Sequence, residues 1–136
     1  MRLKSILTLF FFSLSLLLIA QNNRKKMFED FIKKEKFYSQ ENELSIKNLE
    51  PIVEKSLNRL ASTFEFIGSS KNAETKHYLL AIKKTINELK PYEIDLSIND
   101  KTIISTYIEE LMDFVDLESS EGLLNEFVYG FDLTKK

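Results

Sequence analysis

The sequence predicts an all-α fold, a single-domain bundle of four main helices plus a short C-terminal helix, preceded by a signal peptide. Apolar residues recur at spacings of three and four along five segments, which is the pattern of helices that bury one face. The connections between these segments are short, and neither a repeat nor a low-complexity linker divides the chain. An uninterrupted apolar run stands before the first of the five segments.

The first twenty residues are typical of a secretory signal peptide, with a basic start, a short apolar core and a small residue at the end. The apolar run extends from Ile6 to Ala20, and we expect cleavage between Ala20 and Gln21, although Leu18 occupies a position where a small residue is preferred. The predicted domain is therefore residues 21–136, and the predicted location is outside the cytoplasm, either periplasmic or secreted.

An uncleaved membrane anchor is the alternative interpretation of the same run. As a helix the run would reach about 22 Å, which is short of the roughly 30 Å hydrocarbon core of a bilayer. The basic cluster Arg24, Lys25 and Lys26 follows closely and could retain the segment on the cytoplasmic side. We favour cleavage because the run is short.

The composition excludes several classes of function. Removing residues 1–20 takes away two basic residues and no acidic ones, so the net charge changes from −2 to −4, which argues against general binding of nucleic acid. The chain has no cysteine and a single histidine, His77, which excludes thiol chemistry and zinc sites that need two histidines. Glycine is too scarce for a phosphate-binding loop, and we expect no cofactor.

The first helix is expected over residues 23–38. One face carries Met27, Phe28, Phe31 and Ile32, while the rest of the surface from Lys25 to Lys36 is strongly basic. A basic amphipathic helix can lie on an anionic membrane. Acidic residues interrupt the basic face, so we favour a helix that docks into the bundle through its phenylalanines.

The second helix is expected over residues 51–67, after a polar loop at residues 39–48 that ends in a short turn from Ser45. Pro51 suits the first turn of a helix, and Gly68 is placed to end the helix in a left-handed conformation. The apolar stripe of this helix consists of Val53, Leu57, Leu60, Phe64 and Ile67.

The third helix is expected to end near Lys90 and to be capped by Ser69, Ser70 or Asn72. His77 falls on the side away from its apolar face, where a solvated histidine is expected. The predicted buried face consists of Tyr78, Leu79, Ile82, Ile86 and Leu89.

The fourth helix is expected to start near Ser97 and Asp100, which have the spacing of a capping box, and to run to Leu117. Its apolar arc covers nearly half of the circumference, so it should touch more than one neighbour. A short last helix is expected from Ser120 or Glu121 to Tyr129, with Gly130 as its terminator.

An acidic stripe on the fourth helix continues into the turn before the last helix. Glu109, Asp113 and Asp116 share one face, and Glu118 and Glu121 follow. Clustered carboxylates suit Ca²⁺, and a carboxylate pair can perform acid–base catalysis. The EF-hand pattern is absent, however, and neighbours on a convex helix face form no cleft. We therefore predict no catalytic and no metal-binding residue.

The favoured interpretation of this turn is a solvated face followed by a capped helix start, with Ser119 or Ser120 as the cap. Glycine in the first turn of a helix costs about 1 kcal/mol relative to alanine, so Gly122 is the residue that this interpretation explains least. The predicted binding surface comprises Glu118, Ser119, Ser120, Glu121 and Gly122.

The run EELMDFVDLESSEGLLNEFVYG, residues 109–130, resembles the C-terminal signature of a small bacterial family of helical proteins, domain-of-unknown-function family 4844. The connection PYEIDLSINDK, residues 91–101, fits the same family loosely, so the resemblance covers the last third of the chain. The resemblance implies an all-helical domain. It implies no activity and no functional residues.

The sequence thus indicates an exported, non-catalytic binding module whose partner is another exported protein. One alternative is a carboxylate-based enzyme or a Ca²⁺- or Mg²⁺-binding protein. A further alternative is a membrane-associated protein, held by an uncleaved signal segment or by the surface of the Lys25–Lys36 helix.

Overall fold

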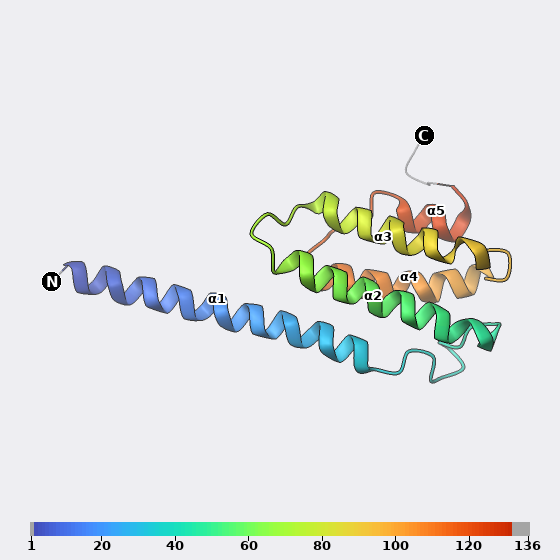
Figure 1. The fold of residues 1–136 in the computed structure, drawn as a ribbon, viewed down its shortest axis with the longest axis horizontal. Helices are drawn as coiled ribbons and strands as arrows, with labels where there is room; N and C mark the ends of the chain where they lie inside the picture. The colour runs from blue at the N-terminus through green and yellow to red at the C-terminus, as the bar shows by residue number, and fades with distance from the viewer. Residues whose placement is uncertain (1, 132–136) are drawn as a thin grey trace.

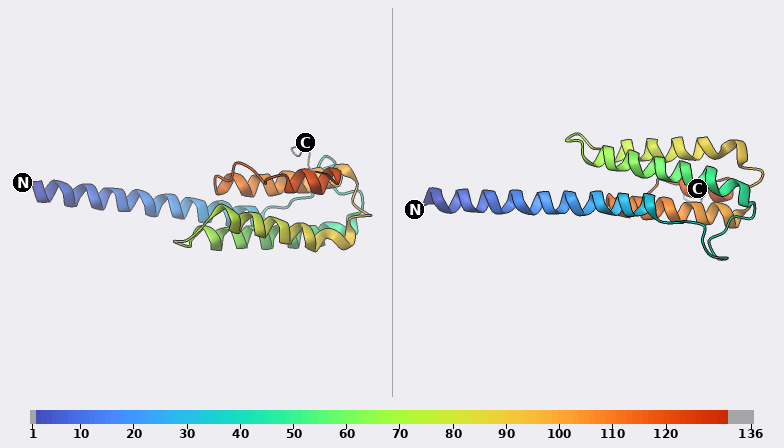
Figure 2. Two further views of the ribbon diagram at one scale, coloured as in Figure 1. Left: turned by 90° about the horizontal axis from the view of Figure 1, so that it is seen from above. Right: turned by 60° about the horizontal axis from the view of Figure 1, so that its bottom comes forward.

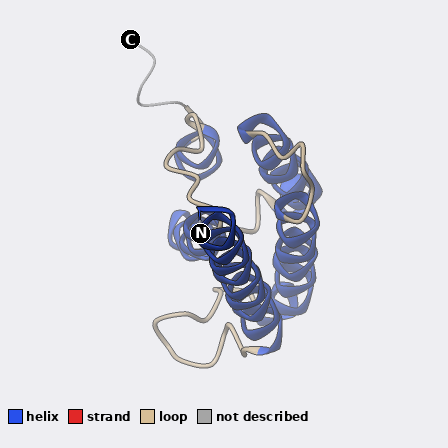
Figure 3. Ribbon diagram, turned by 90° about the vertical axis from the view of Figure 1, so that its left-hand side faces the viewer, coloured by secondary structure: helices blue, strands red, loops and turns tan. Residues whose placement is uncertain are grey.

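The computed structural model describes residues 2–131, and over this range it contains helices and loops but no strand (Figure 1). The prediction of an all-α bundle with four main helices and a short last one is confirmed. The α-helices are α1 (Arg2–Lys33), α2 (Glu50–Gly68), α3 (Thr75–Leu89), α4 (Ile98–Phe114) and α5 (Leu123–Tyr129). Two short 3-10 helices, η1 (Lys47–Leu49) and η2 (Lys90–Tyr92), lie in the connections between them. Figure 3 distinguishes the helices from the loops that join them.

Helix α1 joins the apolar N-terminal segment and the first bundle helix into one continuous element. Residues 4–23 are all exposed, and this part of the helix projects beyond the other helices in each view (Figures 1 and 2). By length and composition α1 could cross a membrane. From Lys4 onwards, the first buried residue of α1 is Phe28, and Phe31 follows one turn later. Residues 4–20 therefore contribute nothing to the core of the bundle.

The end of α1 differs from the prediction, because the helix stops at Lys33 and does not reach Tyr38. Lys36 lies beyond the helix and folds back, so that its Nζ donates to the carbonyl oxygens of Phe31 at 2.9 Å and Lys34 at 3.3 Å. Its side chain is 0% exposed. The predicted basic surface over Lys25–Lys36 is thus wrong at its C-terminal end, since the last lysine caps the helix from inside the bundle.

The connection between α2 and α3 also differs from the prediction. Gly68 is the last residue of α2 and has no positive φ, so it is not a left-handed cap. A Cβ atom at Gly68 would lie 3.4 Å from the Tyr78 hydroxyl oxygen, which is an ordinary van der Waals distance. The cap of α3 is Glu74, and not one of the predicted residues Ser69, Ser70 and Asn72.

Two helices hold the bundle together. Helix α2 contacts α1, α3 and α4, and helix α4 contacts α1, α2 and α5, as predicted for the helix with the widest apolar arc. Aromatic side chains fill the interface between α1 and α4, where the rings of Phe28 and Phe31 meet the ring of Phe114 edge to face. Each edge-to-face pair stabilises the fold by about 0.5–1.5 kcal/mol beyond the stabilisation that comes from burying its apolar surface.

Asp100 fastens the loop before α2 to the start of α4. The predicted capping box is confirmed, because Asp100 Oδ2 accepts a hydrogen bond from the Ser97 backbone N–H at 2.8 Å and the Ser97 hydroxyl accepts one from the Asp100 N–H. Asp100 Oδ1 accepts further bonds from the Ser45 N–H at 2.8 Å and the Ser45 hydroxyl at 3.1 Å. Burial acts to raise the pKa of Asp100, but these hydrogen bonds outweigh burial and hold the pKa below its usual value.

This carboxylate should make the free energy of unfolding depend on pH in the acid range. Because the pKa of Asp100 is lower in the folded state, its stabilisation is fully present above the unfolded-state pKa of about 3.9 and is lost as the pH falls through the folded-state pKa. We expect Asp100→Asn to lower the free energy of unfolding by about 1–2 kcal/mol at pH 7, since the amide oxygen of asparagine can accept from only one of the Ser45 and Ser97 N–H groups and its NH2 group can accept from neither. In urea unfolding the difference from wild type should shrink towards pH 3. A difference that is constant from pH 7 to pH 3 would contradict this role.

Candidate functional site

The predicted binding surface lies in a loop, residues 115–122, which we call the acidic loop. It begins where α4 ends, three residues before the predicted end at Leu117. The Leu117 N–H donates to the Met112 carbonyl at 3.0 Å, and the Asp116 N–H donates to the Asp113 carbonyl at 3.2 Å. Asp116 has a φ of 55°, so the helix ends in a Schellman motif with aspartate in the left-handed position that glycine usually occupies.

Gly122 lies in a tight turn and not in the first turn of a helix, which corrects the prediction. Glu121 and Gly122 have φ values of 51° and 86°, and the Leu123 N–H donates to the Ser120 carbonyl at 3.1 Å. Two consecutive positive φ values define a turn of type I′, in which glycine is strongly preferred. The Ser120 hydroxyl accepts a hydrogen bond from the Leu124 N–H at 3.4 Å, so a serine does assist the start of α5, although the cap itself is Gly122.

The carboxylates near the acidic loop are exposed and do not converge. Within residues 2–131, no three aspartate, glutamate or histidine side chains are close enough together to hold a metal ion. Glu118 and Glu121 are exposed, and Asp116 contacts Arg24 of α1 at 3.4 Å. Six residues earlier, within α4, Glu110 pairs with Lys34 of the segment after α1 at 2.5 Å. Asp116 and Glu110 thus form ion pairs with basic residues of the first part of the bundle, whereas Glu118 and Glu121 face solvent.

A buried lysine between α1 and α2 is the polar feature that the sequence did not reveal. Besides its two carbonyl partners, the Lys36 ammonium lies 3.8 Å from a Glu54 oxygen and 4.6 Å from the centre of the Phe31 ring. Burial lowers the pKa of Lys36, and the nearby Glu54 carboxylate offsets part of that effect. The ammonium is enclosed by the groups that it binds, so it serves the fold and is not accessible to a substrate.

Tyr107 of α4 completes this cluster. Its hydroxyl donates to the carbonyl oxygen of Lys36, and burial raises the pKa of Tyr107 to about 12. The Lys34 ammonium lies 5.2 Å from the centre of the Tyr107 ring while it pairs with Glu110. These contacts hold the segment after α1 against α4, so the perturbed groups of this region are accounted for by structural bonds.

His77 also has a structural role. Its Nδ1 accepts a hydrogen bond from the Glu74 N–H at 3.1 Å, and the two residues form the capping box of α3. The side chain is half-buried and is not the freely solvated one that was predicted. Histidine at this position of a capping box is unusual, since the usual residues are glutamate and glutamine.

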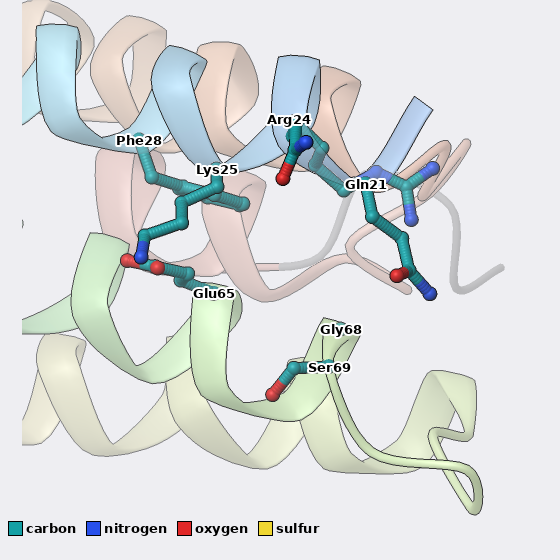
Figure 4. Close-up of a pocket in the computed structure, with 8 residues that line it drawn as sticks. Gln21, Arg24, Lys25, Phe28, Glu65, Gly68 and Ser69 are labelled. Carbon is teal, nitrogen blue, oxygen red and sulfur yellow. The ribbon is translucent and has the colours of Figure 1, made fainter. Parts of the chain in front are cut away.

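A pocket of about 240 Å³ lies between α1 and the end of α2, and we call it the junction pocket (Figure 4). It lies where the exposed half of α1 leaves the bundle. The lining residues are Gln21, Asn22, Arg24, Lys25, Phe28, Glu65, Gly68 and Ser69. All of them follow Ala20 in the sequence, so the pocket would remain whole after the predicted cleavage.

The lining of the junction pocket combines charges of both signs. Figure 4 shows the side chains of Lys25 from α1 and Glu65 from α2 pointing toward one another. Arg24 contributes a guanidinium group and Phe28 an apolar surface. Such a lining can bind a small molecule that carries both a positive and a negative group.

Comparison with known proteins identifies the family of the chain. Residues 19–132 match the family described as domain of unknown function (DUF4844), so the resemblance extends over most of the chain and not only over the last third. The comparison with curated proteins found no match, and neither did the comparison with solved structures. Because the match covers nearly all of the helical bundle, the chain belongs to the DUF4844 family.

Proposed function

We propose that this protein is an exported, non-catalytic binding module. The observation that carries this proposal is the division of α1 into two parts. Residues 4–23 are apolar over most of their length and wholly exposed, whereas Phe28 and Phe31 are buried in the core. An apolar segment that adds nothing to the core is costly in water and is expected where a membrane receives it.

The proposed maturation is cleavage between Ala20 and Gln21. The cut would fall two turns before Phe28, which is the first buried residue of α1 after the cut. The helical part that remains, from Gln21 to Lys33, keeps both of the phenylalanines that pack against α4. Cleavage would therefore release a complete bundle.

The roles of the perturbed groups favour binding over catalysis. Lys36 and Tyr107 bond to backbone carbonyls inside the bundle, and Asp100 is saturated by Ser45 and Ser97. A catalytic acid or base needs access to its substrate, which these enclosed groups lack.

The proposed partner is another exported protein with a basic surface. The acidic loop presents Glu118 and Glu121 to solvent, and the two hydrogen-bonded turns around Asp116 and Gly122 fix their backbone. A surface whose backbone is already ordered loses less entropy on binding than a flexible one. Neutralising a secreted toxin is one concrete role for such a surface.

The double variant Glu118→Lys/Glu121→Lys tests this assignment. We expect it to capture less of the partner from the exported fraction than the wild type does, at an unchanged melting temperature, because both side chains are exposed. Glu29→Lys/Glu41→Lys, which reverses two exposed acids outside the loop, is the matched control. Mass spectrometry reads the captured proteins, and equal capture by all three proteins would exclude the acidic loop.

A further inference from the structure

The junction pocket lies at the depth of lipid head groups whenever the apolar part of α1 is in a membrane. The apolar run ends at Ala20, and the pocket begins at the next residue, Gln21. At 1.5 Å per residue, Arg24 and Lys25 lie about 6–8 Å beyond Ala20 along the helix. The polar layer on each side of a bilayer is about 5–8 Å thick. The pocket would thus open among the head groups.

The charges around the pocket match a zwitterion better than an anion. The cations Arg24 and Lys25 are balanced by Glu65 in the pocket and by Asp116, which lies 3.4 Å from Arg24. A purely anionic head group would face both carboxylates without compensation. A head group with a phosphate and an ammonium could instead place the phosphate by the cations and the ammonium by Glu65.

We propose that the junction pocket binds the phosphoethanolamine head group of a zwitterionic phospholipid and so holds the bundle at the membrane surface. This inference rests on the proposed export, which brings the bundle to the outer face of the membrane. Because every lining residue follows Ala20, the pocket persists in the cleaved protein and can hold the bundle there after the signal segment is removed. A choline head group should bind less tightly, since its methylated nitrogen cannot donate a hydrogen bond to Glu65.

The test uses the full chain in nanodiscs of three compositions. The first contains phosphatidylcholine alone, and in the other two half of this lipid is replaced by phosphatidylethanolamine or by phosphatidylglycerol. We expect phosphatidylethanolamine to raise the melting temperature, followed by circular dichroism, by about 3 °C over phosphatidylcholine alone. Lys25→Gln and Glu65→Gln should each abolish the rise. Lys26→Gln and Glu29→Gln are the control variants, since they change exposed charges of α1 that do not line the pocket. Both should keep the rise in melting temperature.

Free phosphoethanolamine added to the phosphatidylcholine nanodiscs distinguishes the two sources of the head group. A rise with the lipid, with or without a rise from the free compound, supports the proposal. A rise from the free compound alone assigns the pocket to a soluble ligand and overturns it. The absence of any rise, an equal rise with phosphatidylglycerol, or an equal loss in the control variants also overturns it. The proposed export is tested separately on the native protein, so a failure of the head-group proposal can be distinguished from a failure of the proposed export.

Discussion

Phe31→Ala is expected to lower the free energy of unfolding by about 3–5 kcal/mol, the usual cost of removing a buried phenylalanine ring. Phe31 is 1% exposed, and its ring meets the rings of Tyr107 and Phe114 edge to face. The ammonium groups of Lys34 and Lys36 lie 4.9 and 4.6 Å from its centre. The variant therefore opens a cavity and removes the ring that both cations contact.

Urea unfolding at pH 7, followed by far-ultraviolet circular dichroism, measures this loss. The control is Phe66→Ala, which removes the same ring from a position that is 78% exposed and should change the free energy of unfolding by no more than about 0.5 kcal/mol. If Phe31→Ala were as mild as Phe66→Ala, α1 would not be part of the core.

Lys36→Ala should lower the free energy of unfolding by about 3–4 kcal/mol. The change removes a fully buried aliphatic stem and also leaves the Phe31 and Lys34 carbonyls without their charged donor. Lys36→Met keeps most of the stem and should lower the free energy of unfolding by only about 2 kcal/mol. Its loss is smaller than that of Lys36→Ala because the unfavourable desolvation of the ammonium is removed together with the ammonium.

The same urea titration separates the stem from the ammonium. Lys33→Ala, at the exposed last residue of α1, is the matched control and should stay within about 0.5 kcal/mol of wild type. A Lys36→Met variant as stable as wild type would show that the ammonium does not cap α1. In that case the end of the helix at Lys33 would need another cause.

The helices themselves could be predicted because their apolar spacing is a local property of the sequence. The stripe of α2, from Val53 to Phe64, is buried as predicted, and the capping box of Ser97 and Asp100 starts α4. A capping box depends on two residues three positions apart, so sequence alone can identify it. The family resemblance pointed to the same all-helical domain.

The end of α1 could not be predicted, because it depends on contacts that are distant in sequence. Lysine favours helices and exposed positions, so Lys36 was placed on the helix surface. Its burial depends on Glu54 from α2 and on Tyr107 from α4. Nothing near Lys36 in the sequence signals either partner.

The glycines show how a local rule can be misapplied. Gly68 was expected to end its helix in a left-handed conformation and Gly122 to lie in the first turn of a helix, yet Gly68 closes α2 without a positive φ and Gly122 occupies a type I′ turn. The left-handed cap of α4 falls on Asp116, a residue type that adopts this conformation only occasionally. The pair Glu121–Gly122 resembles the Asp–Gly and Asn–Gly pairs of such turns, and this was the available signal.

The sequence revealed one of the two candidate surfaces. The acidic loop is a continuous segment and was found from its composition. The junction pocket brings Lys25 of α1 together with Glu65 of α2, and only the packing of the two helices makes them neighbours. Its residues carry no shared motif, so the pocket could not be found before the fold.

The first residue of the native protein shows most directly whether the exposed apolar part of α1 serves export. N-terminal sequencing and intact-mass measurement of the protein from separated cell fractions would identify that residue. We predict a chain that begins at Gln21 and is recovered from the exported fraction. A chain that still begins at Met1, whether in the cytoplasm or extracted from the membrane only by detergent, would contradict it.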